Sequence, residues 1–371
     1  MKGPLEGIVV ADFSRVLAGP YASMLLGDMG ATVMKVERPE IGDDTRSWSP
    51  PTDEEGVPTY FSSVNRNKHS IALNLDDPDD RARAQRLAHR ADIMIENFPA
   101  GSLESRGLGY AHVCAGNPTI IYCSISGFGA SNDLPGYDLL VQAMGGLMDI
   151  TGSDDPTKVG VAIVDVVAGL HALTAILAAL HHRDRNGGGQ LVEVTLLGAL
   201  LSSLVNQSAS AAITGVSPTR MGNAHPSVAP YEPYPTQDRD IIIAVGNDAQ
   251  FTRLCTALGH PLLASDPRFS TNASRVTHRD ELRALLGALL ATDTADGWMA
   301  TLHNARVPCG PVNTISDALC LATDLGLDPV VDVDGVLQIT NPVTFSQTPI
   351  TYTRRPPQLD EHDAWIEEFL R

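Results

Sequence analysis

The sequence is poor in cysteine, and its few cysteines form no recognisable pattern. The 371 residues include five scattered cysteines and no CxxC pair. Neither a zinc site nor a disulfide framework is indicated, so we expect no metal site. Reduced thiols are typical of a cytoplasmic protein.

Basic residues are scarce as well. Lysine and arginine number 26 against 44 aspartate and glutamate residues, which gives a formal net charge of −18. This balance argues against a nucleic-acid partner, because binding to phosphate backbones needs a basic surface. It still permits one anionic ligand in a local basic pocket, since net charge describes the whole surface and not a single site.

Long hydrophobic runs and common catalytic motifs are also missing. The longest apolar run, 166–180, is interrupted by His171 and is shorter than the roughly 20 residues of a membrane span. The first ten residues do not resemble a signal peptide. The segment 127–132 fails the GxGxxG pattern at its last position, and no P-loop, HExxH or GxSxG occurs. We expect a soluble cytoplasmic protein without a membrane partner.

Strand and helix signals alternate in the first half of the chain. Apolar stretches typical of buried strands occur at 7–13, 31–37, 70–75, 91–97 and 118–125, and helical patterns at 20–29, 76–89 and 166–182. This alternation predicts an α/β fold with a mostly parallel sheet and helices on its faces. A stretch rich in Pro, Gly, Asn and Tyr at 217–235 indicates a linker or active-site loop, and a smaller unit follows it.

Asp165 is a lone carboxylate in an apolar stretch, at the predicted junction between a strand and the helix 166–182. Aspartate is a favoured N-cap, so a purely structural role is one interpretation. The other is that a carboxylate among apolar residues at a helix N-terminus serves as a nucleophile or base. The two roles are compatible.

Basic residues are concentrated in the first 110 residues of this acidic chain. Each of them taken alone is best interpreted as a solvated surface residue, but together they could form an anion pocket. Lys35 and Arg38 follow a predicted parallel strand, near the sheet edge where α/β proteins bind ligands. The set comprises Arg15, Lys35, Arg38, Arg46, Arg66, Lys68 and Arg106.

Several ordered motifs resemble the family III CoA-transferases, a group that includes formyl-CoA:oxalate CoA-transferase and α-methylacyl-CoA racemase. The resemblance spans nearly the whole chain. It is carried by the segments 5–20, 30–39, 65–71, 96–98, 136–143, 187–190, 307–313 and 341–343. It implies a Rossmann-like large CoA-binding domain at 1–205, completed by 325–371, a linker or active-site loop at 206–235, and a small α+β domain at 236–324. It also implies an interlaced homodimer.

The resemblance implies that Asp165 attacks an acyl-CoA thioester and becomes an aspartyl-CoA thioester through a mixed anhydride. Coenzyme A and acyl-CoA are then substrates, and no permanently bound cofactor is implied. Arg38 and Lys68 would contact CoA phosphates. Arg106 is displaced by one position from the family's arginine, which leaves its phosphate contact open. The remaining CoA contacts implied are Val16, Ala18, Asn97, Phe98 and Tyr137.

The same resemblance leaves other activities to consider. The racemases carry a His-Asp pair where this sequence has Tyr137 and Asp138. Tyrosine, with an ordinary pKa near ~10, is a poor general base, so this position favours transfer over racemisation. We expect Tyr137 and Asp138 to contact the substrate. A catalytically silent acyl-CoA-binding protein is the alternative from another class.

The loop 222–231 resembles that of relatives acting on succinyl-CoA and other dicarboxylates. His225 in this loop either faces the substrate or makes a structural hydrogen bond. The prediction is a CoA-transferase that moves CoA from a short acyl-CoA, with succinyl-CoA as a candidate donor, to a small carboxylic or dicarboxylic acid.

Overall fold

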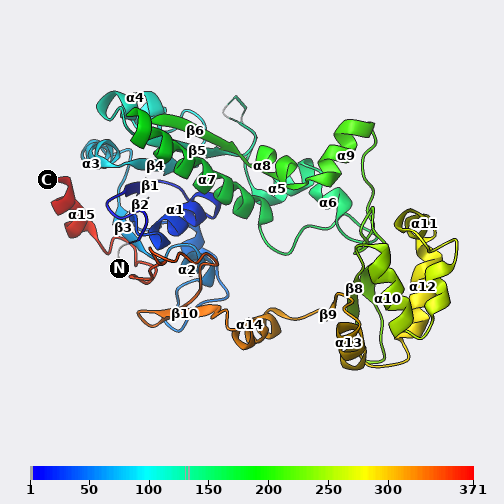
Figure 1. Cartoon of the computed structure of the whole chain (residues 1–371). Coiled ribbons are helices and arrows are strands. Elements are labelled where there is room, and N and C mark those ends of the chain that lie inside the picture. Colours follow the sequence, from blue (N-terminus) through cyan, green and yellow to red (C-terminus); the bar gives the residue numbers. More distant parts are fainter. Residues whose placement is uncertain (1–2, 130, 133) are drawn as a thin grey trace. The chain divides into compact units, whose positions relative to one another are not determined.

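The computed structural model describes residues 3–129, 131–132 and 134–371, and the chain divides into two compact units (Figure 1). The first comprises Met1–Leu147, Lys158–Ser217 and Asp328–Arg371, and the second Met148–Thr157 and Pro218–Leu327. These units differ from the sequence-based boundaries at four places. Segments 148–157, 218–235 and 325–327 belong to the second unit, and segment 206–217 belongs to the first.

The first unit is built on a six-stranded parallel sheet with the order β3-β2-β1-β4-β5-β6. Its strands are β1 (Val9–Asp12), β2 (Thr32–Glu37), β3 (Lys68–Ala72), β4 (Ile93–Glu96), β5 (Ile121–Ser126) and β6 (Gln190–Thr195). This Rossmann-like arrangement confirms the predicted α/β class. The third strand begins two residues earlier than the sequence predicts.

Side chains alternate between the two faces of this sheet, which explains its two hydrophobic cores. Val10 and Ile93 face a core that contains α1 (Ala18–Asp28), α7 (Ile163–Asn186) and α8 (Leu196–Ser203). Ala11 and Met94 face the opposite core, with α3 (Pro78–Arg90), α4 (Tyr110–Gly116) and α15 (Asp363–Leu370) (Figure 1). Period-two burial of this kind is what a parallel sheet covered on both faces requires.

Helix α7 is long and apolar enough to cross a membrane by length and composition. It packs against α1, α8 and the strands β5 and β6 within the first core. A core helix of a globular protein meets the same length and composition test, so α7 gives little support to a membrane span. Gly187 ends α7 in the left-handed conformation with φ +81°, as glycine commonly does.

The first unit contains further short elements. They are α2 (Thr59–Ser63), α5 (Asp138–Met144), α9 (Asn206–Thr214), the 3-10 helices η1 (Asp44–Ser47) and η2 (Glu104–Arg106), and an antiparallel hairpin of β10 (Val330–Val333) and β11 (Val336–Ile339). The short helix α6 (Leu147–Ile150) lies where the chain passes into the second unit.

The second unit has the predicted α+β character. Its antiparallel sheet has the order β7-β8-β9, formed by Tyr231–Tyr234, Ile241–Ala244 and Cys309–Pro311. A separate core of apolar side chains, including Ile243 and Phe251, joins this sheet to its helices. The helices are α10 (Asp248–Ala257), α11 (Asn272–Thr277), α12 (Arg279–Leu290), α13 (Ala295–Asn304) and α14 (Ile315–Asp324).

Strand order in the large sheet predicts where a ligand binds. The strand order reverses between β1 and β4. From β1 the chain continues to β2 and β3 on one side of the sheet, and from β4 it continues to β5 and β6 on the other side. Crevices at such a reversal, beyond the carboxyl ends of the strands, are the usual ligand sites of open α/β sheets. The turns that follow β1 and β4, at 13–17 and 97–98, therefore mark the region to examine.

Candidate functional site

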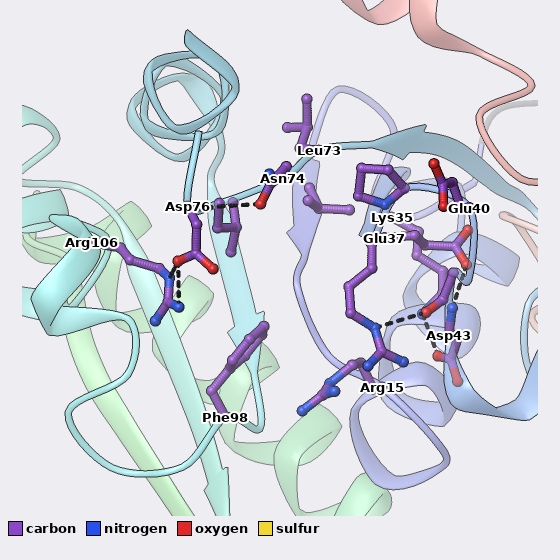
Figure 2. A pocket seen from close by; sticks show the side chains of 15 residues that line it. Arg15, Lys35, Glu37, Glu40, Asp43, Leu73, Asn74, Asp76, Phe98 and Arg106 are labelled. Atoms are coloured by element: carbon purple, nitrogen blue, oxygen red, sulfur yellow. Dashed lines mark hydrogen bonds and ion pairs between the residues drawn. The ribbon is translucent and has the colours of Figure 1, made fainter. Parts of the chain in front are cut away.

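A pocket of about 390 Å³ opens at the carboxyl ends of β1, β2 and β4. Figure 2 shows Arg106 and Asp76 on one side of it and Glu37 and Asp43 on the other, with Arg15 and Phe98 between them. Predicted CoA contacts Arg38, Phe98 and Arg106 all line this pocket. The structure therefore brings together residues that are far apart in the sequence.

Three arginines in this pocket keep part of their side chains exposed. Arg38 donates to the Asp44 carboxylate at 2.5 Å, and Arg106 donates to Asp76 at 2.7 Å. Arg15 lies with its guanidinium carbon 4.9 Å from the centre of the Phe98 ring. Its Nε is buried and has no hydrogen-bond partner among the described residues. Four acids in the lining, Glu37, Glu40, Asp43 and Asp76, balance its four basic residues. The arginines still have exposed N–H donors, which suit an anionic ligand that replaces their carboxylate partners.

Lys68 does not lie in this pocket, contrary to the predicted phosphate contact. Its side chain is completely buried, and Nζ donates to Asp12 at 3.0 Å, to the Pro20 carbonyl at 2.9 Å and to Asn65 at 2.9 Å. These bonds use all three donors of the ammonium group. Burial lowers the pKa of Lys68 to about 8 against the opposing effect of Asp12. The geometry fits an internal structural role.

Lys35 is equally buried, and it supports the turn that follows β1. Its ammonium donates to the Ser14 carbonyl at 3.0 Å and to Asp43 at 2.9 Å. Burial would raise the pKa of Asp43, but Lys35 and the bonds from Thr45 lower it to about 2. Asp43 is therefore ionised at neutral pH, as a member of an internal ion pair.

Val16 adopts a left-handed backbone conformation, with φ +69°, that β-branched residues avoid. Its N–H points at the Asp43 carboxylate at 3.3 Å. Asn97 holds the neighbouring Arg15 from the other strand, accepting its N–H at 2.9 Å and donating to its carbonyl at 2.7 Å. Strain at a non-glycine residue persists only where its surroundings enforce it, and it is often found at binding sites.

Asp165 occupies the first turn of α7, which begins two residues before it. The strand predicted to precede Asp165 is absent, and the N-cap position is held by Ala162, which offers no side-chain acceptor. Asp165 is thus not a helix cap, and the capping interpretation was wrong. The exposed amides of this turn are satisfied instead by Asp138 of α5, which accepts N–H bonds from Val164 at 2.8 Å and from Asp165 at 3.3 Å.

The environment of Asp165 stabilises its protonated form. Burial and then the nearby charge of Asp138 raise the pKa of Asp165 to about 7. Within the residues the structure describes, no ion pair of Asp165 offsets this effect. The two acids also affect Tyr60 of α2. Burial first, and then the charges of Asp165 and Asp138, raise the pKa of Tyr60 to about 12. A carboxylate whose pKa lies near neutrality is a candidate for chemistry rather than for a structural ion pair.

Close packing of α1 against α7 connects the strained turn to Asp165. A Cβ built on Gly169 would lie 2.6 Å from the carbonyl oxygen of Ala18. Asp165 and Gly169 are four residues apart and share one face of α7. The predicted CoA residue Ala18 therefore adjoins the helix face that carries Asp165, and Val16 lies two residues before Ala18 in the chain.

The remaining predicted residues are placed less centrally. Tyr137 precedes α5 and is 65% exposed, so its ring is available to a ligand. His225 lies in the second unit, where its Nδ1 accepts the N–H of Ser227 at 3.1 Å and its ring lies 5.4 Å from that of Tyr231. This hydrogen bond matches the structural interpretation of His225. Contact with substrate stays a prediction for Tyr137, Asp138 and His225.

Sequence reasoning did not identify three residues of this region: Asp43, Tyr60 and Gln142. Asp43 and Tyr60 lie in irregular or short segments without periodicity, so no local signal distinguishes them. Gln142 stands four residues after Asp138 on one helix face, a spacing that allows a side-chain hydrogen bond. That spacing was a usable signal. Among the residues described, no cluster of His, Cys, Asp or Glu could hold a metal ion.

Fold and site together define an α/β protein with an arginine-lined pocket at the strand-order reversal and, nearby, a partly buried carboxylate without an ion-pair partner among the described residues. The sequence model of CoA-transferase family III matches residues 5–363. The chain belongs to this family, and it is a CoA-transferase.

Characterised relatives resemble the chain over nearly its whole length. Succinate–glutarate CoA-transferase of Agrobacterium fabrum is 43% identical, covering 98% of this chain and 95% of its own length. Acetyl-CoA:oxalate CoA-transferase of Acetobacter aceti is 38% identical, covering 99% of this chain and 96% of its own. A CAIB/BAIF family protein from Brucella suis is 42% identical, with a TM-score of 0.90 over 100% of both chains.

Proposed function

We propose that this chain moves CoA from a short acyl-CoA, with succinyl-CoA as the leading donor, to a small dicarboxylic acid. The observation that carries the proposal is Asp165: a partly buried carboxylate without a cationic partner, beside the strained Val16 turn. Support for the donor comes from the relatives named for succinate and glutarate. A carboxylate nucleophile needs neither metal nor ATP, because each step exchanges one activated acyl bond for another.

The reaction proceeds in two half-reactions. The Asp165 carboxylate attacks the thioester carbonyl, the carbon–sulfur bond breaks, and a mixed anhydride and CoA thiolate form. The thiolate then attacks the Asp165 carbonyl carbon, and the donor acid leaves with one former Asp165 oxygen. The acceptor carboxylate repeats these steps in reverse and departs as the new CoA ester. A pKa of about 7 makes Asp165 a stronger base than an ordinary aspartate while leaving much of it ionised near neutral pH.

The arginine-lined pocket is the proposed site of the CoA phosphates. Arg38, Arg106 and Arg15 provide its cationic groups, and the buried, unpartnered Nε of Arg15 is a donor that a ligand could satisfy. Phe98 offers a ring face for the adenine. Val16 and Ala18 are proposed to approach the pantetheine arm through their backbone, and Asn97 acts by holding Arg15 in place.

Trapping the covalent intermediate tests this function directly. The protein is incubated with succinyl-CoA, acetyl-CoA or propionyl-CoA and examined by intact-mass spectrometry, with and without hydroxylamine. We expect an enzyme–CoA adduct with succinyl-CoA that hydroxylamine converts to a hydroxamate, and no adduct on Asp165→Asn. A panel of carboxylic acids then identifies the acceptor by its new CoA ester. Tight CoA binding without any adduct or exchange would instead indicate a silent acyl-CoA-binding protein.

Racemisation of 2-methylacyl-CoA is the second candidate activity. Asp165 could also exchange a proton at the α-carbon, but the position that carries histidine in racemases is the exposed Tyr137. We therefore expect no deuterium uptake from heavy water into a 2-methylacyl-CoA when no acceptor acid is present. Uptake at a rate comparable with CoA transfer would favour the isomerase.

We also propose that the protein works as a homodimer in the cytoplasm. Helix α14 has no buried residue in the isolated chain, and its Ile315 is 83% exposed. Helix α9 is equally uncovered, with Ile213 at 83% exposure. Apolar surface of this extent usually meets a partner, here a second copy. Sedimentation analysis should give the mass of two chains, and a monomer at micromolar concentration would refute the dimer.

A further inference from the structure

Helix α5 presents two polar side chains on the face that looks toward the start of α7. Asp138 is its first residue, and Gln142 follows one turn later. The Gln142 amide donates to Asp138 Oδ2 at 2.6 Å. Gln142 is 1% exposed, so this bond lies in the protein interior, where a misplaced amide would be costly.

Gln142 also forms hydrogen bonds with the segment that leads into α7. Its Oε1 accepts the N–H of Val159 at 2.9 Å, and its Nε2 approaches the Val161 carbonyl at 3.4 Å. This segment has no strand or helix of its own before Ile163. Its conformation therefore depends on the buried Gln142 side chain.

Asp138 binds the first turn of α7, and we call Asp138 and Gln142 together the clamp. One carboxylate oxygen accepts the N–H groups of Val164 and of Asp165 itself, and the other accepts the Gln142 amide. Together the two side chains bracket residues 159–165. The backbone that carries Asp165 is thus fixed from a neighbouring helix rather than by its own cap.

The clamp places a second negative charge beside Asp165. In the part of the chain that the structure describes, neither carboxylate takes part in an ion pair. Tyr60 of α2 lies near enough to interact with both acids, and its phenol is neutral at physiological pH and brings no positive charge. Repulsion between two such acids is relieved whenever one of them loses its charge.

We infer that Asp138, oriented by Gln142, positions Asp165 and favours the covalent enzyme–CoA state over the free carboxylate. The inference rests on the proposed function. When Asp165 exchanges its negative oxygen for the sulfur of CoA, the donor acid carries that charge away into solution. The thioester form of Asp165 is neutral, so it no longer experiences the charge of Asp138. Asp138 acts through Asp165 and needs no contact with the reacting acyl group.

The equilibrium of the first half-reaction tests this inference. Full-length protein is mixed with succinyl-CoA and graded succinate, and the ratio of CoA-bound to free enzyme is read from intact masses. We expect Asp138→Asn, which keeps an oxygen acceptor but removes the charge, to lower the equilibrium constant roughly tenfold, equivalent to one pKa unit. Asp184→Asn is the matched control, because Asp184 is an exposed acid at the other end of α7. It should match the wild type.

An equilibrium constant for Asp138→Asn within twofold of the wild-type value would overturn the inference. If instead the wild type acquires no adduct, the proposed function itself fails, so the two failures are distinguishable. The pH profile gives an independent readout: the acidic limb of kcat/KM should move to lower pH in Asp138→Asn, since the like charge is gone.

Gln142→Met keeps the test decisive if Asp138→Asn does not fold. This variant retains side-chain volume but loses the bonds to Asp138 and to Val159. We expect kcat to fall about tenfold with an unchanged KM for succinyl-CoA, because orientation and not binding is lost. An unchanged kcat in a folded Gln142→Met protein would show that the clamp has no role in positioning.

Discussion

Asp43 and Asp165 are both poorly exposed carboxylates near the start of a helix, yet their pKa values move in opposite directions. Asp43 contacts the Lys35 ammonium and has a pKa of about 2. Asp165 has another acid for a neighbour and a pKa of about 7. Burial favours the neutral form in both places, so the neighbours decide the outcome. Asp43 is a structural anion that stabilises a turn, whereas Asp165 has the pKa expected of a reactive carboxylate.

The largest expected effect is the loss of CoA-transfer activity when Asp165 is replaced. Asp165→Asn should reduce CoA transfer by at least about 1,000-fold, because it removes the nucleophile and leaves only binding and orientation. Turnover is measured with succinyl-CoA and the best acceptor acid, and circular dichroism confirms folding. Asp184→Asn serves as the charge-matched control. Residual turnover above a tenth of wild type would place the nucleophile elsewhere.

Removal of the cation beside Asp43 should have the next largest effect, on stability. Lys35→Met leaves a buried carboxylate without its partner, and we expect the free energy of unfolding to fall by about 3 kcal/mol at neutral pH. Denaturant titration measures the change. Lys158→Met is the control, since Lys158 is an exposed lysine, and it should alter stability by less than about 0.5 kcal/mol. Equal effects of the two variants would contradict the importance of the Lys35–Asp43 pair.

Stability as a function of pH sharpens the contrast further. The folded chain holds a proton on Asp165 up to pH about 7, whereas an unfolded aspartate releases it near pH ~3.9, so wild-type stability falls between these values. Asp165→Asn lacks this titration. It should therefore be more stable than wild type by roughly 2 kcal/mol at pH 8, after allowance for partial exposure, and similar at pH 3.

Urea titrations of wild type and Asp165→Asn at several pH values give this difference. Asp43→Asn provides the opposite case, because Asp43 stabilises the fold when ionised and its contribution is lost as the pH falls toward about 2. A stability difference between Asp165→Asn and wild type that does not vary with pH would contradict the raised pKa.

The smallest effect concerns the packing that joins the two regions. Gly169→Ala places a Cβ 2.6 Å from the Ala18 carbonyl and should cost about 1–2 kcal/mol of unfolding free energy while weakening CoA binding. Gly287→Ala is the matched control. Gly287 also lies within a helix, but nothing lies within 4 Å of its added Cβ, so alanine should stabilise by about 0.5 kcal/mol. Thermal melts and CoA titrations check both variants.

The sheet was predictable from sequence because each strand carries its own signal. The strands β1, β2 and β4 are short apolar runs between turn residues. Near-continuous apolar sequences of this kind are typical of parallel strands that are covered on both faces. The apolar run at 159–164 carries the same signal but forms no strand. Its backbone is bound instead by Gln142 of α5, an interaction that depends on tertiary structure.

Lys68 shows the same limit for the site. The family resemblance implies that it contacts phosphate, but Lys68 is the first residue of β3, and Asp12 and Pro20, about 50 residues earlier, surround its ammonium. Arg38 follows β2 and Arg106 ends a short 3-10 helix, so both line the pocket, and their contact with CoA phosphates stays a prediction. Burial of a charge is determined by distant partners, and a single sequence does not display them.

Helix α7 also forms part of the connection that returns the chain from β5 to the edge strand β6. The residue proposed to react with CoA therefore lies on a helix that the fold requires and not on a loop that could be replaced. Evolution can exchange the residues that select an acceptor acid while this helix stays intact. Relatives named for glutarate and for oxalate are consistent with such divergence around a retained architecture.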